Sequence, residues 1–188
     1  TTEGVLADKV VRQALVGGAD PEEALANLMK PMLPVREPIL SSTKSYDPSF
    51  QQLHVGTDAA NQMLDAAGWV RQANGIRAKN GQPLVFKLYA QNTAEYTKVT
   101  GQLKTQWRRL GADVQVFLQA DVDLRSTVST HSYDAILYGI SLGVDPDVFV
   151  YWHSTQADVR SPSRLNLYLL SKALLDLSLQ QLLRAGYG

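Results

Sequence analysis

The spacing of apolar residues changes along this chain, and the changes predict an alternation of helices and strands. Apolar residues recur at helical spacing over residues 8–15, 57–67 and 96–110. Residues 84–89 are expected to form a strand, and apolar residues alternate with polar or exposed positions over residues 114–118, as in a second strand. The order of these stretches indicates an α/β domain.

Capping and helix-breaking residues predict where the helices begin and end. Asp20, which a proline follows, predicts the start of a helix that runs to about Met29. Thr57 is the expected N-cap of the next helix, which Gly68 should end. Gly111 should end the helix over residues 96–110 in the same way.

An uninterrupted apolar run over residues 135–138 predicts a third strand, buried on both faces. A polar helix over residues 121–130 should precede it. Strand–helix–strand–helix–strand implies a parallel sheet with right-handed crossovers. A leucine-rich helix is expected over residues 167–183. The predicted fold class is therefore α/β, with a parallel-rich central sheet flanked by helices.

Four prolines interrupt the chain ahead of this α/β region. Because they occur between residues 31 and 48, residues 31–56 are expected to form an extended loop that wraps over the surface. Residues 57–188 are expected to form the α/β core, and residues 1–30 to form helices that precede the loop.

Composition excludes several classes of function. The 188 residues include 45% apolar and 19% charged residues, no cysteine, and a formal net charge of zero. No disulfide or thiol nucleophile is possible. A chain whose net charge is zero is a poor partner for nucleic acid. No apolar run approaches the length of a membrane span, and no signal segment opens the chain, which suggests a fragment of something longer.

Residues that could carry chemistry are few. His54, His131 and His153 have no second ligand at a metal-binding spacing, and no cofactor-binding motif occurs, so neither a metal nor a cofactor is expected. Asp145 and Asp147 could be a carboxylate pair, but the proline between them favours a turn. No catalytic residues are therefore predicted, and the chain is not expected to be an enzyme.

Polar and aromatic side chains gather soon after the third predicted strand. Trp152, His153, Ser154 and Gln156 combine an aromatic wall with groups that orient a ligand, near the sheet edge where α/β folds bind ligands. The alternative is that Trp152 belongs to the core and His153 bonds a local backbone group.

Several short motifs occur in a characteristic order and together cover nearly the whole chain. They are residues 8–15 (DKVVRQAL), 19–20, 46–48 (YDP), 58–69 (DAANQMLDAAGW), 75–81 (GIRAKNG), 102–111, 133–139 (YDAILYG), 145–147 (DPD) and Asn166. Their order resembles that of the oligopeptide and dipeptide substrate-binding proteins of ABC importers.

This resemblance implies that the chain is the second lobe of a two-lobed receptor with a periplasmic-binding-protein-like fold. The missing first lobe would supply the other wall of the cleft, and residues 1–30 would lie at the lobe junction. The receptor would sit outside the cytoplasmic membrane, or in the periplasm, anchored by a lipid. It would hold a peptide or peptide-like ligand and dock on ABC permease subunits.

The resemblance adds Gly139, Ser141 and Asn166 to the expected ligand-binding residues. One departure is that Ile140 stands where the family has an aromatic residue after the third strand. The family's aspartate that pairs with a peptide amine has no clear counterpart. Another cargo, such as a sugar or a metal chelate, or a structural or signalling role without transport, therefore remains open.

Overall fold

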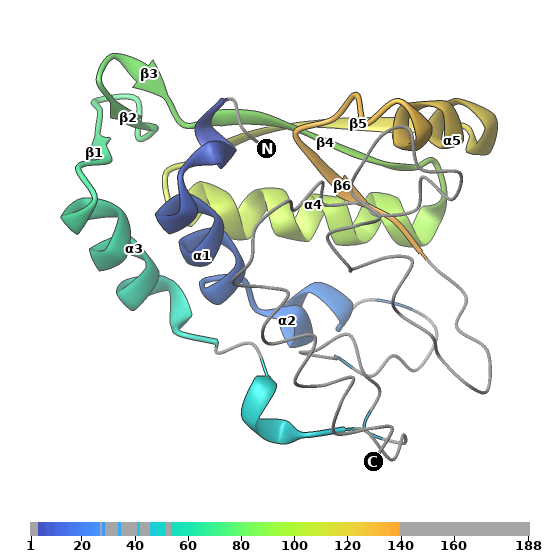
Figure 1. Cartoon of the computed structure of the whole chain (residues 1–188), viewed down its shortest axis with the longest axis horizontal. Coiled ribbons are helices and arrows are strands. Elements are labelled where there is room, and N and C mark those ends of the chain that lie inside the picture. The colour runs from blue at the N-terminus through green and yellow to red at the C-terminus, as the bar shows by residue number, and fades with distance from the viewer. Residues whose placement is uncertain are drawn as a thin grey trace, which may run out of the picture.

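The computed structural model describes residues 4–26, 28, 34, 41, 46–51 and 54–139 (Figure 1). The predicted helix over residues 167–183 and the predicted turn at residues 145–147 lie outside these residues. In chain order the elements are η1 (Val5–Ala7), α1 (Lys9–Gly17), α2 (Pro21–Leu25), η2 (Pro48–Phe50), α3 (Gly56–Ala66), β1 (Val70–Arg71), β2 (Arg77–Lys79), β3 (Gln82–Pro83), β4 (Val85–Gln91), α4 (Ala94–Arg109), β5 (Asp113–Gln119), α5 (Asp121–Ser129) and β6 (Ala135–Leu137).

The predicted parallel sheet is present. Its strands lie in the order β5-β4-β6, and both pairs are parallel. The predicted alternation of strands with α4 and α5 is therefore confirmed. The prediction for the third strand was wrong in one respect, because all three residues of β6 are half-buried rather than buried on both faces. Among the described strands β6 pairs with β4 alone, so it lies at an edge of the sheet and not in its centre.

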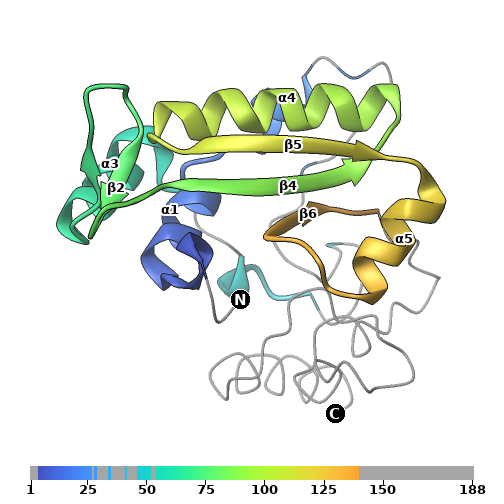
Figure 2. The same ribbon diagram turned by 90° about the horizontal axis from the view of Figure 1, so that it is seen from above.

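Burial alternates along β4 and separates the two faces of the sheet. Phe86, Leu88 and Ala90 are buried, whereas Lys87 between them is exposed. The buried face packs against α1 and α4, which lie on the same side of the sheet in Figure 1. Figure 2 shows the molecule from above, with β5 between α4 and β4 in this view and α5 beside the carboxyl ends of both strands.

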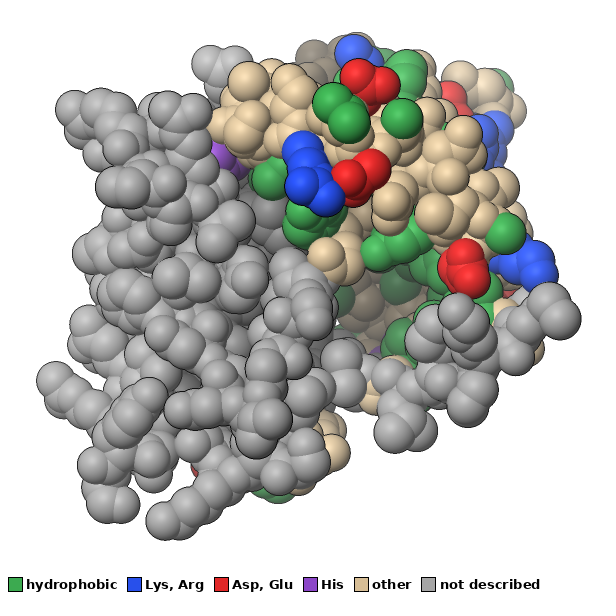
Figure 3. Space-filling model, turned by 90° about the vertical axis from the view of Figure 1, so that its right-hand side faces the viewer, with side chains coloured by type: hydrophobic (Ala, Val, Ile, Leu, Met, Phe, Trp, Pro, Cys, Tyr) green, Lys and Arg blue, Asp and Glu red, His purple; other side chains and the backbone are tan. Residues whose placement is uncertain are grey.

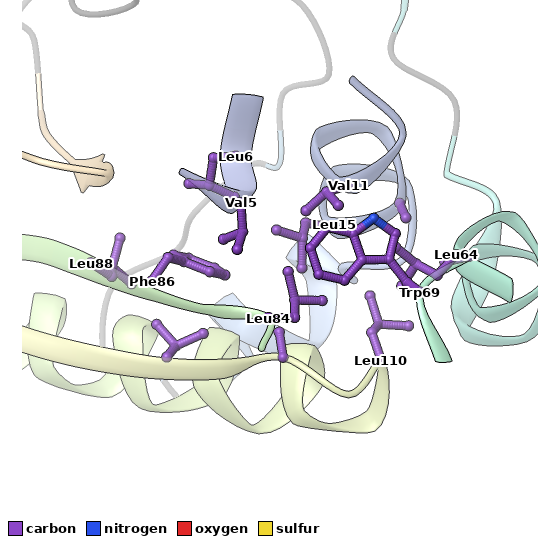
Figure 4. Packing of buried hydrophobic residues seen from close by; sticks show 14 residues of the cluster. Val5, Leu6, Val11, Leu15, Leu64, Trp69, Leu84, Phe86, Leu88 and Leu110 are labelled. Atoms are coloured by element: carbon purple, nitrogen blue, oxygen red, sulfur yellow. The ribbon is translucent and has the colours of Figure 1, made fainter. Parts of the chain in front are cut away.

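One apolar core joins the N-terminal elements to the sheet. Figure 4 shows side chains of η1, α1, α3 and β4 converging between the helices and the strands. Val11, Leu64, Leu84 and Leu110 are fully buried there. The N-terminal elements therefore share one core with the sheet, since Val5 of η1 is also a member of this cluster.

Side-chain caps account for two helix starts and fail at a third. Asp8 accepts a hydrogen bond from the backbone of Val10, and Asp20 accepts one from Glu23, at 2.9 and 3.0 Å. The second helix, α2, ends at Leu25, before the predicted end. Thr57 is not an N-cap, because α3 begins one residue earlier without a side-chain cap.

A small antiparallel sheet was not predicted. Its strands lie in the order β1-β2-β3, project beside α3 in Figure 1, and are each only two or three residues long. Asn80 and Gly81 both have positive φ, at 52° and 78°, as a two-residue hairpin turn requires. An Asn-Gly pair is typical of such a turn, but strands this short show no measurable alternation.

Candidate functional site

The carboxyl ends of the parallel strands meet at one edge of the sheet. Gln91 at the end of β4 pairs with Gln119 at the end of β5. The backbone N–H of Asn92 extends this ladder by donating to the carbonyl of Gln119 over 2.8 Å. Gly139 follows β6 by two residues. Because ligands bind at this edge in open α/β sheets, it is the candidate site.

Gly139 is the one predicted ligand-binding residue that the described part contains. It is exposed and lies against Tyr96 in the first turn of α4, so closely that a Cβ at this position would collide with the tyrosine hydroxyl. Thr93 fixes that turn as its N-cap, accepting the backbone N–H of Tyr96 at 3.3 Å. Segments more than 40 residues apart therefore meet at the site.

The described part of this edge offers amides and hydroxyls. The hydroxyl of Thr127 in α5 donates to Oε1 of Gln119 over 2.9 Å, which orients that amide. Asn92 is exposed, and Tyr96, four residues later, is half-buried. Figure 3 looks onto this side of the molecule, where charged side chains of both signs are scattered over the described part, besides the amides and hydroxyls. Such groups suit the N–H and C=O groups of a peptide or the hydroxyls of a sugar.

Sequence reasoning missed part of this site. From the sequence, Tyr96 was predicted only as an apolar position of the helix over residues 96–110, and Asn92 was not predicted at the site. Their place directly after a strand of a parallel sheet was the available signal. The other predicted ligand-binding residues lie outside the described residues; they are Ser141, Trp152, His153, Ser154, Gln156 and Asn166.

Arg77 shows that part of the family-like motif over residues 75–81 is structural. Its side chain is 2% exposed. Nε donates to the carbonyl of Leu110 over 2.9 Å, and Nη1 donates to the carbonyl of Trp69. Nη1 also pairs with Asp65, and this hydrogen bond from Arg77 is the main reason that the pKa of Asp65 is lowered. Arg77 therefore ties α3, β2 and the end of α4 together.

Asp8 organises a second structural cluster. Its Oδ2 accepts hydrogen bonds from Nε1 of Trp69 at 3.1 Å and from Nζ of Lys79 at 3.0 Å. Burial by itself raises the pKa of Asp8, but the hydrogen bonds from Trp69, Lys79 and Val10 outweigh it, so the pKa is lowered. These charges face one another and not the carboxyl edge of the sheet.

The described residues bear on two other classes of site. Within them, no three histidine, aspartate or glutamate side chains lie together as metal ligands would. In the same part of the chain, no helix has the length and apolar character needed to cross a membrane. His54 has a local partner, since its Nδ1 lies 2.9 Å from the carbonyl oxygen of Ala19.

Comparison with known families decides the relationship. The family model described as bacterial extracellular solute-binding proteins, family 5, middle region, matches residues 1–161. The chain belongs to this family. The resemblance inferred from its motifs is therefore confirmed. No curated protein matches the chain.

Solved structures of family 5 type support the fold. The oligopeptide-binding protein AppA from Bacillus subtilis, in complex with a nonapeptide, is 24% identical with a TM-score of 0.78, over 96% of this chain and 36% of its own. NikZ from Campylobacter jejuni, in complex with Ni(L-His), is 23% identical with a TM-score of 0.80. The match covers 95% of this chain and 36% of NikZ. MelB from Agrobacterium fabrum, in complex with stachyose, is 19% identical with a TM-score of 0.60. The match covers 69% of this chain and 21% of MelB.

The periplasmic-binding-protein-like fold is thus shown. This chain spans about 36% of the length of the first two structures.

Proposed function

We propose that this chain is one ligand-binding lobe of an extracellular, two-lobed receptor that delivers peptides or peptide-like solutes to an ABC importer. The observation that carries the proposal is the family match over residues 1–161 in a chain that spans about a third of its structural relatives. The remaining length of such a receptor would supply the first lobe. The two lobes would close on a ligand by hinge motion.

The carboxyl edge of the sheet would form this lobe's wall of the cleft. Tyr96, Asn92 and Gln119 present hydroxyl and amide groups there, and the lack of a side chain at Gly139 lets the Tyr96 hydroxyl lie close to the backbone. These groups can bond a peptide main chain without reading its side chains, as peptide receptors of broad specificity require. Ser141, Trp152, His153, Ser154, Gln156 and Asn166 would extend the same wall.

The role is binding and delivery, not catalysis. The family consists of solute-binding proteins, and the carboxyl edge shows amides and hydroxyls where a nucleophile and its base would be needed. ABC permease subunits would be the partners of the closed receptor. A lipid anchor would hold it at the outer face of the cytoplasmic membrane or in the periplasm.

A second class of cargo has specific support. Two similar proteins were solved with Ni(L-His) and with stachyose, so related lobes accept a metal chelate and a sugar. The amides and hydroxyls at the edge can bond sugar hydroxyls as well as peptide groups. We favour peptides because the motifs first resembled peptide receptors.

Mass spectrometry of small molecules released from the full-length receptor tests this proposal. We expect peptides of mixed sequence, and Gln119→Met should reduce the amount retained. Gln82→Met is the matched control, because Gln82 is exposed in the small antiparallel sheet. Sugars or chelates alone would select the other cargo, and the absence of any small molecule at equal stability would contradict a receptor role.

A further inference from the structure

The outer edge of β5 offers backbone hydrogen-bonding groups that the described sheet does not use. Asp113 donates its N–H to Leu84 over 2.9 Å, and Gln119 accepts from Asn92, so the odd-numbered residues of β5 face β4. Residues 114, 116 and 118 therefore point their N–H and C=O groups the other way. Within the described strands β5 has one neighbour, so this edge is open to a further strand.

A groove with an excess of positive charge runs beside this edge. It has a volume of about 730 Å³ and is lined by α4 and by the beginning of β5. Three cations line it, Lys104, Arg108 and Arg109, whereas Asp113 is the single carboxylate among its lining residues. Asp113 lies 3.6 Å from Arg108, and Glu23 of α2 pairs with Arg109 at 3.0 Å. Lys104 is exposed and has no ion pair with any described residue, so it is available to an acidic partner.

The opposite face of the same edge is aromatic. Phe117 is 40% exposed and stacks on Tyr89 of β4 with ring centroids 5.1 Å apart. Nζ of Lys87 lies 5.8 Å from the centroid of Phe117. Because side chains alternate between the faces of a strand, a strand added to β5 would meet the cations of α4 on one face and Phe117 on the other.

We propose that the outer edge of β5 is a docking site for an extended segment of another protein in which acidic and apolar residues alternate. The segment would add to the sheet as a strand. Its backbone would bond residues 114, 116 and 118, its acidic side chains would meet Lys104 and Arg108, and its apolar side chains would cover Phe117. This site lies on a side edge of the sheet, and its last residue, Leu118, lies next to Gln119 at the carboxyl end of β5.

A capped heptapeptide of alternating glutamate and valine is the probe. Binding to the receptor is measured by fluorescence polarisation, and amide exchange is followed by NMR in its presence and absence. We expect the amides of Val114, Val116 and Leu118 to exchange at least tenfold more slowly with the peptide bound. The amides of Gln115 and Phe117 already bond β4, so their exchange should not change.

Two comparisons separate strand addition from other binding. The double variant Lys104→Glu, Arg108→Glu should weaken binding at least tenfold. Lys98→Glu, exposed on the same helix but outside the groove, should change it less than twofold. A fully N-methylated peptide should not bind. Unchanged exchange at residues 114, 116 and 118, or equal affinity for the double variant, would overturn the proposal. So would protection of these amides by a second copy of the chain at high concentration without peptide.

Discussion

Replacing Arg77 by methionine should strongly destabilise the chain while leaving the surface unchanged. The guanidinium is almost fully buried and serves two buried backbone carbonyls, those of Leu110 and Trp69. Methionine has a similar length and fills much of the same space, but it donates no hydrogen bond. Both carbonyls would then be buried without this partner.

The expected loss follows from those two carbonyls. An unsatisfied buried polar group costs about 1–3 kcal/mol, so two of them cost about 2–6 kcal/mol, and we expect a loss near the middle of this range, about 3–5 kcal/mol, in the free energy of unfolding. Asp65 adds little, because its side chain is 62% exposed and water replaces the arginine. For a domain of this size the loss corresponds to a decrease in Tm of about 6–20 °C.

Urea unfolding followed by tryptophan fluorescence measures this change, since Trp69 is buried and Trp107 half-buried. Arg71→Met is the matched control. Arg71 also bonds backbone carbonyls, those of Gly75 and Arg109, but it does so at the surface, where water can replace it. We expect less than about 1 kcal/mol for this variant. Equal stabilities of the two variants would refute the reasoning from burial.

Three further predictions concern packing, pH and the cleft. Gly18→Ala should destabilise the chain by about 1–3 kcal/mol, because a Cβ there would lie 2.7 Å from Cβ of Ala60; unfolding by urea measures it. Asp8→Asn should cost about 1–2 kcal/mol at pH 7 through lost charge-assisted hydrogen bonds, measured by thermal unfolding across pH. In the full-length receptor, Trp152→Ala should weaken ligand binding by about 1–3 kcal/mol in a calorimetric titration, if this side chain is a wall of the cleft.

Each of these predictions has its own control. Gly101→Ala should stabilise the chain by about 0.5–1 kcal/mol, because nothing lies near a Cβ there; destabilisation at both glycines would point to a general effect. The pKa of Asp8 is lowered in the folded state, so its contribution is present above the unfolded pKa of about 4 and is lost as pH falls through the folded pKa. A deficit of Asp8→Asn that persists below that range would contradict the charge argument. If Trp152→Ala lowers stability and not affinity, Trp152 belongs to the core.

Periodicity predicted most of the fold because the elements concerned are long enough to show it. In the helix α4 and the strands β4 and β5, one face packs inward, so apolar residues recur along the sequence with the period of a helix or a strand. Strands of two or three residues carry no such pattern, which is why β1, β2 and β3 were missed. The start of α3 depends on a contact distant in sequence, since the N–H of Val55 donates to the carbonyl of Gly17 over 2.8 Å.

The site was harder to predict than the fold. Gly139 was expected at the site from the resemblance, but its contact with Tyr96 depends on how the residues after β6 lie against the first turn of α4. Arg77 illustrates the opposite difficulty, which is that a structural residue can look functional. A charged residue in a family-like motif suggests a contact with the ligand. Only the packing of α3 against the end of α4 shows that Arg77 is enclosed and structural.

Titration calorimetry of the full-length receptor and of this 188-residue chain, with the same recovered cargo, tests the central claim most directly. A lone lobe offers about half of the contacts, which must still offset a loss of about 4–15 kcal/mol in translational and rotational freedom. We therefore predict a Kd weaker than about 1 mM for the chain alone. The full-length receptor should bind at least about a hundredfold more tightly, a difference of about 2.7 kcal/mol. Equal affinity of the two proteins would contradict the claim that this chain supplies one wall of a shared cleft.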